Sequence, residues 1–254
     1  NNYILETHHL TKEFKGFTAV DDVSLNIRRG HIHALIGPNG AGKTTVFNLL
    51  TKYLIPTSGK ILFNGRDITA VESSAIARQG LVRSFQISAV FPNLTVLENV
   101  RVALQQREGN SFHFWKPESV LDRLNERAEQ LLEAVGLQDF ARVVTVDLSY
   151  GRKRALEIAT TLALDPEMLL LDEPTQGMGQ EDVERTADLI RTVAVNRTIL
   201  MVEHNLKVVS QLADRITVLQ RGAVLTEGDY ATVSADPRVR EAYLGVAADK
   251  EAVA

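Results

Sequence analysis

A glycine-rich segment near the start of the chain carries the clearest chemical signal. Residues 37–44 read Gly-Pro-Asn-Gly-Ala-Gly-Lys-Thr, which matches the phosphate-binding pattern G-x-x-x-x-G-K-[ST]. Glycines let successive backbone N–H groups turn toward phosphate oxygens, and a helix that follows adds its positive N-terminal end. Lys43 would place a charge on the β- and γ-phosphates, and the Thr44 hydroxyl would face Mg²⁺. The segment predicts a nucleoside triphosphate site.

Two adjacent carboxylates form the second chemical element. Asp172 and Glu173 follow the apolar run at residues 168–171. If that run is a parallel strand, both acids lie at the carboxyl edge of the sheet, where ligands bind in such folds. Asp172 is suited to the Mg²⁺ shell, and Glu173 is suited to polarise the water that attacks the γ-phosphate. Adjacent acids at a strand end are common, so this interpretation depends on the phosphate loop.

The elements around these residues alternate between strands and helices. Residues 32–36, 168–171 and 199–202 are short apolar runs typical of strands buried on both faces. Residues 23–27 alternate apolar and polar side chains like a half-buried strand, residues 59–65 form another candidate strand, and residues 216–225 suggest a hairpin. Apolar spacing predicts helices after the phosphate loop and over residues 182–193. The pattern favours an α/β fold with a parallel sheet.

The middle of the chain has a different character. Residues 118–135 show helical spacing that ends before Gly136, and Ser149 would cap a helix over residues 152–164. We interpret residues 109–117, which include Phe112, Phe114 and Trp115, as a surface loop with locally packed aromatic side chains. This region predicts an inserted helical subdomain.

Composition limits the class of protein. The 254 residues suffice for one large or two small domains, and the net charge of −4, from 28 basic and 32 acidic residues, disfavours a duplex DNA binder. The absence of cysteine excludes disulfides and thiolate metal sites. No apolar run approaches the ~20 residues of a membrane helix, and no export signal is visible. We therefore expect a soluble, cytoplasmic protein.

The order of these motifs resembles the ATPases of the ATP-binding cassette (ABC) transporters, over residues 10–245. Residues 148–152, Leu-Ser-Tyr-Gly-Arg, are similar to that family's LSGGQ signature, although Tyr150 and Arg152 depart from it. The resemblance implies a single ABC ATPase domain over residues 1–254. Its P-loop NTPase core, with a parallel sheet and an antiparallel β subdomain, would span about residues 1–86 and 166–254. The helical signature subdomain would span residues 87–165.

The same resemblance implies roles for individual residues. Glu173 and His204 would act on the γ-phosphate and the attacking water, and Gln86 would contact both Mg²⁺ and that water. A loop-capping role for His204 remains open on the residues alone. Phe14 would stack on adenine, with Phe17 as a competitor for that place and a core phenylalanine as the alternative. Mg²⁺ would be held by Thr44, Gln86 and Asp172. The implied ATP-binding residues are Phe14, Val20, Gly37, Pro38, Asn39, Gly40, Ala41, Gly42, Lys43, Thr44, Thr45, Ser149 and Gly151.

The signature also implies a dimer. In ABC ATPases the helix that starts at the signature points at ATP held by a second subunit, so two chains would sandwich two ATP molecules. Gly179 stands where many of these ATPases have aspartate, which puts coupling between the subunits through that loop in doubt.

The C-terminal segment indicates which subfamily of ABC ATPases the chain resembles. Residues 236–245, Asp-Pro-Arg-Val-Arg-Glu-Ala-Tyr-Leu-Gly, resemble the ATPase subunits of branched-chain amino-acid importers. The alternatives are the ATPases of urea and amide importers, the lipopolysaccharide exporter ATPase and non-transport ABC ATPases. It also remains open that the tail is only a docking helix that fills a hydrophobic groove and says nothing about the substrate. The resemblance implies permease subunits and a second ATPase subunit as partners, and a substrate-binding protein indirectly. It also implies a peripheral place on the cytoplasmic membrane face.

Overall fold

The core of the molecule is a six-stranded sheet in the order β11-β10-β4-β9-β8-β7. The computed structural model describes residues 2–84, 90–107 and 118–243. Neighbouring strands are parallel except for the antiparallel edge pair β10–β11. The strand bounds are Ile32–Ile36 for β4, Leu81–Arg83 for β7, Met168–Asp172 for β8, Thr198–Val202 for β9, Arg215–Gln220 for β10 and Ala223–Gly228 for β11. The predicted parallel sheet and hairpin are confirmed.

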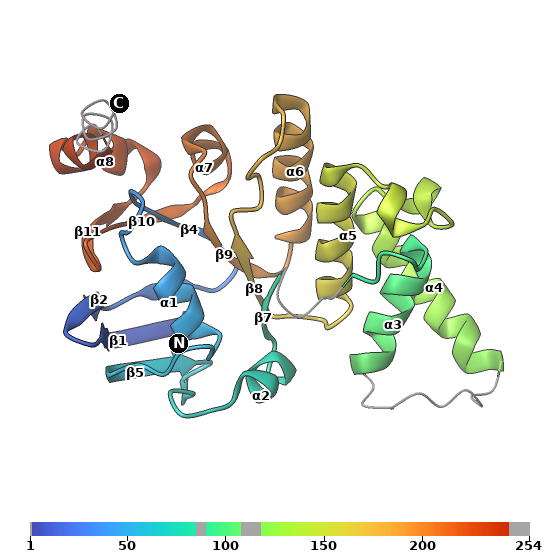
Figure 1. Cartoon of the computed structure of the whole chain (residues 1–254), viewed down its shortest axis with the longest axis horizontal. Helices are drawn as coiled ribbons and strands as arrows, with labels where there is room; N and C mark the ends of the chain where they lie inside the picture. The colour runs from blue at the N-terminus through green and yellow to red at the C-terminus, as the bar shows by residue number, and fades with distance from the viewer. Residues whose placement is uncertain (1, 85–89, 108–117, 244–254) are drawn as a thin grey trace.

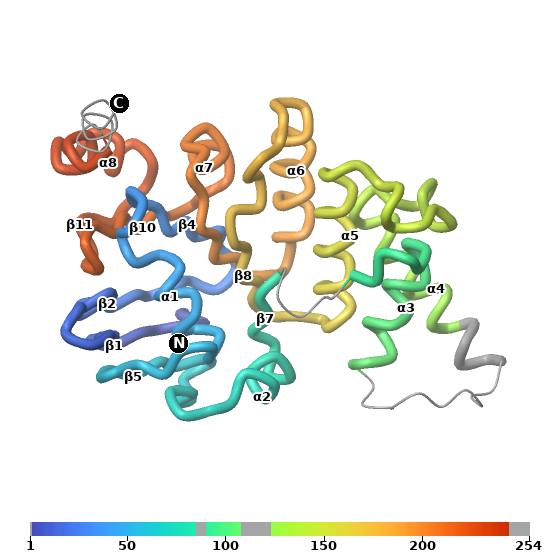
Figure 2. Tube along the Cα trace, viewed as in Figure 1, coloured from blue at the N-terminus to red at the C-terminus, as the bar shows by residue number. Residues whose placement is uncertain are grey.

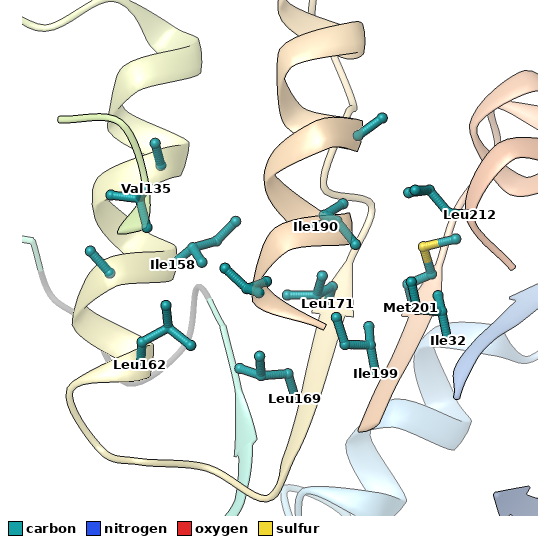
Figure 3. Close-up of a cluster of buried hydrophobic side chains, with 14 of the residues drawn as sticks. Ile32, Val135, Ile158, Leu162, Leu169, Leu171, Ile190, Ile199, Met201 and Leu212 are labelled. Atoms are coloured by element: carbon teal, nitrogen blue, oxygen red, sulfur yellow. The ribbon is translucent and has the colours of Figure 1, made fainter. Parts of the chain in front are cut away.

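Both faces of this sheet are covered, as the continuous apolar runs predict. Along β8, Leu169 and Leu171 belong to one buried cluster, whereas Met168 and Leu170 belong to another on the opposite face. Strand geometry explains this division, since successive side chains point to opposite faces. Figure 3 shows the first cluster, in which Leu171 lies near side chains from the helices that cover that face.

A second, antiparallel sheet lies beside the first. Its strands are β1 (Tyr3–Phe14), β2 (Phe17–Val23), β3 (Asn26–Arg28), β5 (Ser58–Phe63) and β6 (Arg66–Asp67). The single strand expected over residues 23–27 is wrong, because β2 ends at Val23 and β3 begins at Asn26. Thr7 of β1 explains the break. Its hydroxyl donates to the Val23 carbonyl at 3.0 Å and accepts from the Leu25 N–H at 2.8 Å.

The helical part of the chain is inserted between two neighbouring strands. Figure 2 shows β7 and β8 side by side, although α3, α4 and α5 separate them in sequence. The predicted helix at 118–135 is observed as α4, and the capped helix α5 begins two residues earlier than predicted, at Tyr150. The bounds are Val96–Arg107 for α3, Glu118–Ala134 for α4, Gln138–Phe140 for η1, Thr145–Asp147 for η2 and Tyr150–Leu162 for α5.

The remaining helices flank the two sheets (Figure 1). They are α1 (Lys43–Leu50), α2 (Ser73–Arg78), α6 (Gln180–Val193), α7 (Leu206–Leu212) and α8 (Tyr230–Ala235). Helix α6 starts two residues before the predicted position, after Gly179 at its N-cap. Within the described ranges, every helix is too short or too polar to cross a bilayer.

A buried histidine links the central strand to the sheet edge. The His33 Nε2 atom of β4 lies 2.7 Å from the Thr217 hydroxyl of β10. That hydroxyl donates to the Glu227 carboxylate of β11 at 2.8 Å, so the neutral imidazole donates through Nε2. Burial lowers the pKa of His33 to about 4, although Glu227 raises it in opposition.

This pKa makes folding stability depend on pH. Between pH 6.5 and 4 the unfolded chain protonates His33 while the folded chain does not, so the free energy of unfolding falls as the pH falls. The full loss is about 3 kcal/mol, and it begins as the pH falls below about 7, where the unfolded chain starts to bind the proton. Urea unfolding of the wild type and His33→Gln between pH 7 and pH 4.5 checks this expectation. Equal pH dependence in the two proteins would contradict it.

Candidate active site

The phosphate loop runs from the end of β4 to the start of α1, as predicted. Gly37 and Gly42 have positive φ angles of 154° and 100°. A Cβ atom at Gly37 would lie 2.2 Å from the Leu219 carbonyl oxygen, and one at Gly42 would lie 2.7 Å from the Ala19 carbonyl oxygen. Glycine is therefore required at both places by packing against β10 and β2, in addition to any contact with phosphate.

Lys43 lies inside this loop and is 6% exposed. Its ammonium donates hydrogen bonds to the carbonyl oxygens of Gly37 and Pro38. Burial lowers the pKa of Lys43, and the charge of Glu173 opposes that shift. The loop lysine and the Glu173 carboxylate after β8 therefore share one electrostatic environment, although they lie 130 positions apart in sequence, from 43 to 173.

The other implied ATP-binding residues surround the loop. Thr44 is exposed and Thr45 is half-buried in the first turn of α1. Val20 is fully buried in β2, and its Cγ2 atom would lie 3.7 Å from a Cβ at Gly42. Phe14 and Phe17 face each other across the β1–β2 hairpin and are 41% and 66% exposed, so Phe14 is not a core residue. Stacking on adenine stays a prediction.

Glu173 and His204 meet at the carboxyl edge of the sheet. Strands β8 and β9 are paired in register, with Asp172 opposite Val202, so the residues that follow emerge together. The Glu173 Oε1 atom lies 2.6 Å from the His204 Nε2 atom. Glu173 has a left-handed backbone with φ of 47°. The pair joins a proton acceptor to a group that can orient it, beside the phosphate loop.

Asp172 has a partner that the sequence did not reveal. Arg83 of β7, 5% exposed, pairs with the Asp172 carboxylate. Its other terminal nitrogen donates to the Asn48 side chain at 2.8 Å, and its guanidinium lies 5.5 Å from the centre of the Phe47 ring. An arginine in the otherwise apolar segment Leu81–Arg83 is the one signal that could have found this contact.

The side-chain oxygen atoms near the phosphate loop are of the type that Mg²⁺ prefers as ligands. The Asp172 carboxylate and the Thr44 hydroxyl are hard oxygen ligands, and Mg²⁺ in nucleotide sites takes few protein ligands besides phosphate and water. Among the described residues, no cluster of three or more His, Cys, Asp or Glu side chains is placed to hold a metal by itself. Gln86, the third implied ligand, lies outside the described residues, as does the aromatic segment at 109–117.

One part of the expected site is not assembled within the chain. Ser149 caps α5, and its hydroxyl lies 3.5 Å from the Arg152 N–H. Figure 1 shows α5 between α6 and the other inserted helices, with α1 on the far side of the strands. Gly151 instead contacts α6, where a Cβ would lie 3.0 Å from the Asp182 carboxyl carbon. The chain does not place Ser149 and Gly151 at its own phosphate loop.

Comparison with known proteins agrees with this geometry. A family model described as "ABC transporter" matches residues 20–176, and one described as "Branched-chain amino acid ATP-binding cassette transporter" matches residues 223–249. The high-affinity branched-chain amino acid transport ATP-binding protein BraF of Pseudomonas aeruginosa is 38% identical over 251 residues, covering 96% of this chain and 98% of BraF. The Escherichia coli K12 protein LivG, of the same description, is 39% identical with the same coverage.

Solved structures are also similar. An ADP-bound ATP-binding cassette of an ABC transporter has a TM-score of 0.84 and 28% identity, covering 96% of this chain and 100% of that one. A dimeric cassette in a post-hydrolysis state with ADP and phosphate has a TM-score of 0.73 and 25% identity, covering 89% and 98%.

Proposed function

Because the chain belongs to the ABC transporter family, we propose that it is the ATP-hydrolysing subunit of an importer for branched-chain or related amino acids. Hydrolysis rests on one observation above all. The Glu173 carboxylate lies 2.6 Å from His204, and its negative charge raises the pKa of Lys43 against the effect of burial. The proposed base Glu173, its orienting group His204 and the phosphate loop therefore lie close together. The amino-acid class rests on the match of residues 223–249 and on the named relatives.

In the proposed mechanism the phosphate loop and Lys43 neutralise the γ-phosphate, which lowers the cost of charge that develops during transfer. Glu173 accepts the proton of the attacking water, and His204 orients Glu173 through the 2.6 Å contact. Thr44, Asp172 and Gln86 would hold Mg²⁺, and its charge would stabilise the phosphate oxygens. Phe14 provides an exposed ring for the adenine.

A second ATPase subunit completes the proposed site. Ser149 and Gly151 lie away from their own phosphate loop, so they would bind the γ-phosphate of ATP held by the partner. Light scattering on a sizing column tests this, using Glu173→Gln with and without Mg-ATP. A nucleotide-dependent dimer supports a like-with-like pair, and an ATP-bound monomer points to an unlike partner.

The remaining assignments follow from the family. Residues 87–165 would form the helical signature subdomain, and residues 1–86 and 166–254 the core with its β subdomain. We place the protein on the cytoplasmic membrane face, bound to permease subunits that receive substrate from a binding protein. No nucleic-acid partner is proposed.

Substrate uptake tests the whole proposal. A strain that lacks the gene should lose uptake of labelled leucine, the wild-type gene should restore it, and Lys43→Ala should not. Uptake of an unrelated sugar is the control. If leucine uptake is unchanged and urea uptake is lost, the protein serves a urea or amide importer instead. If leucine uptake is unchanged and the outer membrane lacks lipopolysaccharide, it serves the lipopolysaccharide exporter. A strain with none of these defects would point to a non-transport ABC ATPase.

A further inference from the structure

A buried carboxylate stands between the two segments that carry the proposed catalytic pair. Glu203 follows β9 and is 2% exposed. Its Oε1 atom accepts hydrogen bonds from the backbone N–H groups of His204 and Asn205, at 2.8 and 3.1 Å. Its Oε2 atom accepts from the Thr175 hydroxyl at 2.8 Å and from the Thr175 N–H at 3.3 Å. These four bonds compensate the burial of the charge.

The four bonds join two segments that are distant in sequence. Thr175 lies two residues after Glu173, and His204 directly follows Glu203. One carboxylate thus ties the segment after β8 to the segment after β9, the two segments that carry Glu173 and His204. The Glu173 N–H also donates to the Val202 carbonyl at 2.8 Å, which holds the same segments together from the strand side.

The backbone of Glu173 needs such a restraint. Its φ of 47° is left-handed, a conformation that costs a non-glycine residue energy and persists only where the surroundings enforce it. On the C-terminal side the Gln176 N–H donates to the Glu173 carbonyl at 3.1 Å, and Thr175 ties this turn to Glu203 through both its N–H and its hydroxyl. Loss of the bonds to Glu203 would free the turn that follows Glu173 and shift the Glu173 carboxylate relative to His204.

We propose that Glu203 is a positioning residue for ATP hydrolysis, which holds Glu173 and His204 in the register that their contact requires. The proposal rests on the roles proposed above for these two residues. A carboxylate suits the task because it offers about four acceptor positions and no donor. Glutamine has the same shape, but its NH₂ group would face two of the four donors and could accept from neither.

The test compares steady-state ATP hydrolysis by the full chain and by Glu203→Gln. We expect kcat to fall about 10- to 100-fold, the effect of a small misplacement of reacting groups, while the KM for ATP stays within about 2-fold because the phosphate loop is untouched. Glu167→Gln is the matched control. Glu167 lies at the opposite end of β8, bound to Arg29 and Asn64, and we expect wild-type kinetics.

A double-mutant cycle separates positioning from general destabilisation. If Glu203 acts through the pair, Glu203→Gln should lower kcat little further in a His204→Ala background. Equal losses in both backgrounds, or a wild-type kcat in the single variant, would overturn the proposal. Glu173→Gln in parallel tests the underlying function: if that variant also keeps a wild-type kcat, the proposed base is wrong rather than the role of Glu203 alone.

Thr175 supplies a second test that does not require Glu203→Gln to fold. Thr175→Val keeps the shape and the backbone N–H but removes the hydroxyl that binds Glu203, whereas Thr175→Ser keeps it. We expect a several-fold lower kcat in the valine variant and a kcat near that of the wild type in the serine variant, each measured well below the thermal unfolding midpoint of that protein. Equal kcat in the two variants would count against the proposal.

Discussion

Replacement of Glu173 by glutamine is expected to lower kcat for ATP hydrolysis by about 10²- to 10⁴-fold, the contribution of a general base. Glutamine has the same size but cannot accept the proton of the attacking water. Nucleotide binding should persist or tighten, because the phosphate loop is unchanged and a negative charge near Lys43 is removed. Phosphate release by the purified protein, with nucleotide affinity measured separately, checks both parts.

Two outcomes would change the assignment of the base. Wild-type turnover in Glu173→Gln would remove Glu173 from that role. Loss of nucleotide binding together with turnover would indicate that the substitution disturbs the site itself, since the amide should leave the loop intact. Glu167→Gln again serves as the control, because its carboxylate is half exposed at the far end of β8.

Replacement of Arg83 by methionine is expected to cost about 3–5 kcal/mol of folding stability, the usual effect of removing one partner of a buried ion pair. Methionine keeps the aliphatic part of the side chain but removes the guanidinium, and with it the contact with the Phe47 ring. It leaves the Asp172 carboxylate, 25% exposed, without its cation, and Asn48 without a donor. Urea unfolding at pH 7 in magnesium-free buffer measures the loss.

Arg29→Met is the matched control for this prediction. Arg29 also pairs with a carboxylate, that of Glu167, but the two side chains are 46% and 53% exposed. Solvent screens such a pair, so its loss should cost no more than about 1 kcal/mol. Equal losses of folding stability in the two variants would contradict the expectation that burial makes the Arg83–Asp172 pair contribute more than the exposed Arg29–Glu167 pair.

Local patterns account for the correct predictions. The phosphate loop is a contiguous string, and the apolar runs at β4, β8 and β9 are long enough to identify buried strands without knowledge of their neighbours. Ser149 is recognisable as a cap because capping acts over three residues. The β1–β2 hairpin was missed because polar and charged residues interrupt its apolar pattern, and much of its surface is exposed.

Contiguous motifs in the sequence thus predict the chemical groups of the site and the strand ends that carry them: the phosphate loop, Asp172, Glu173 and His204. Which of these groups touch one another depends on the three-dimensional fold. The parallel pairing of β7, β8 and β9 brings Arg83 to Asp172, Glu173 to His204, and Glu203 to Thr175. These contacts follow from strand order and register, which long-range packing determines and which no local spacing of residues encodes.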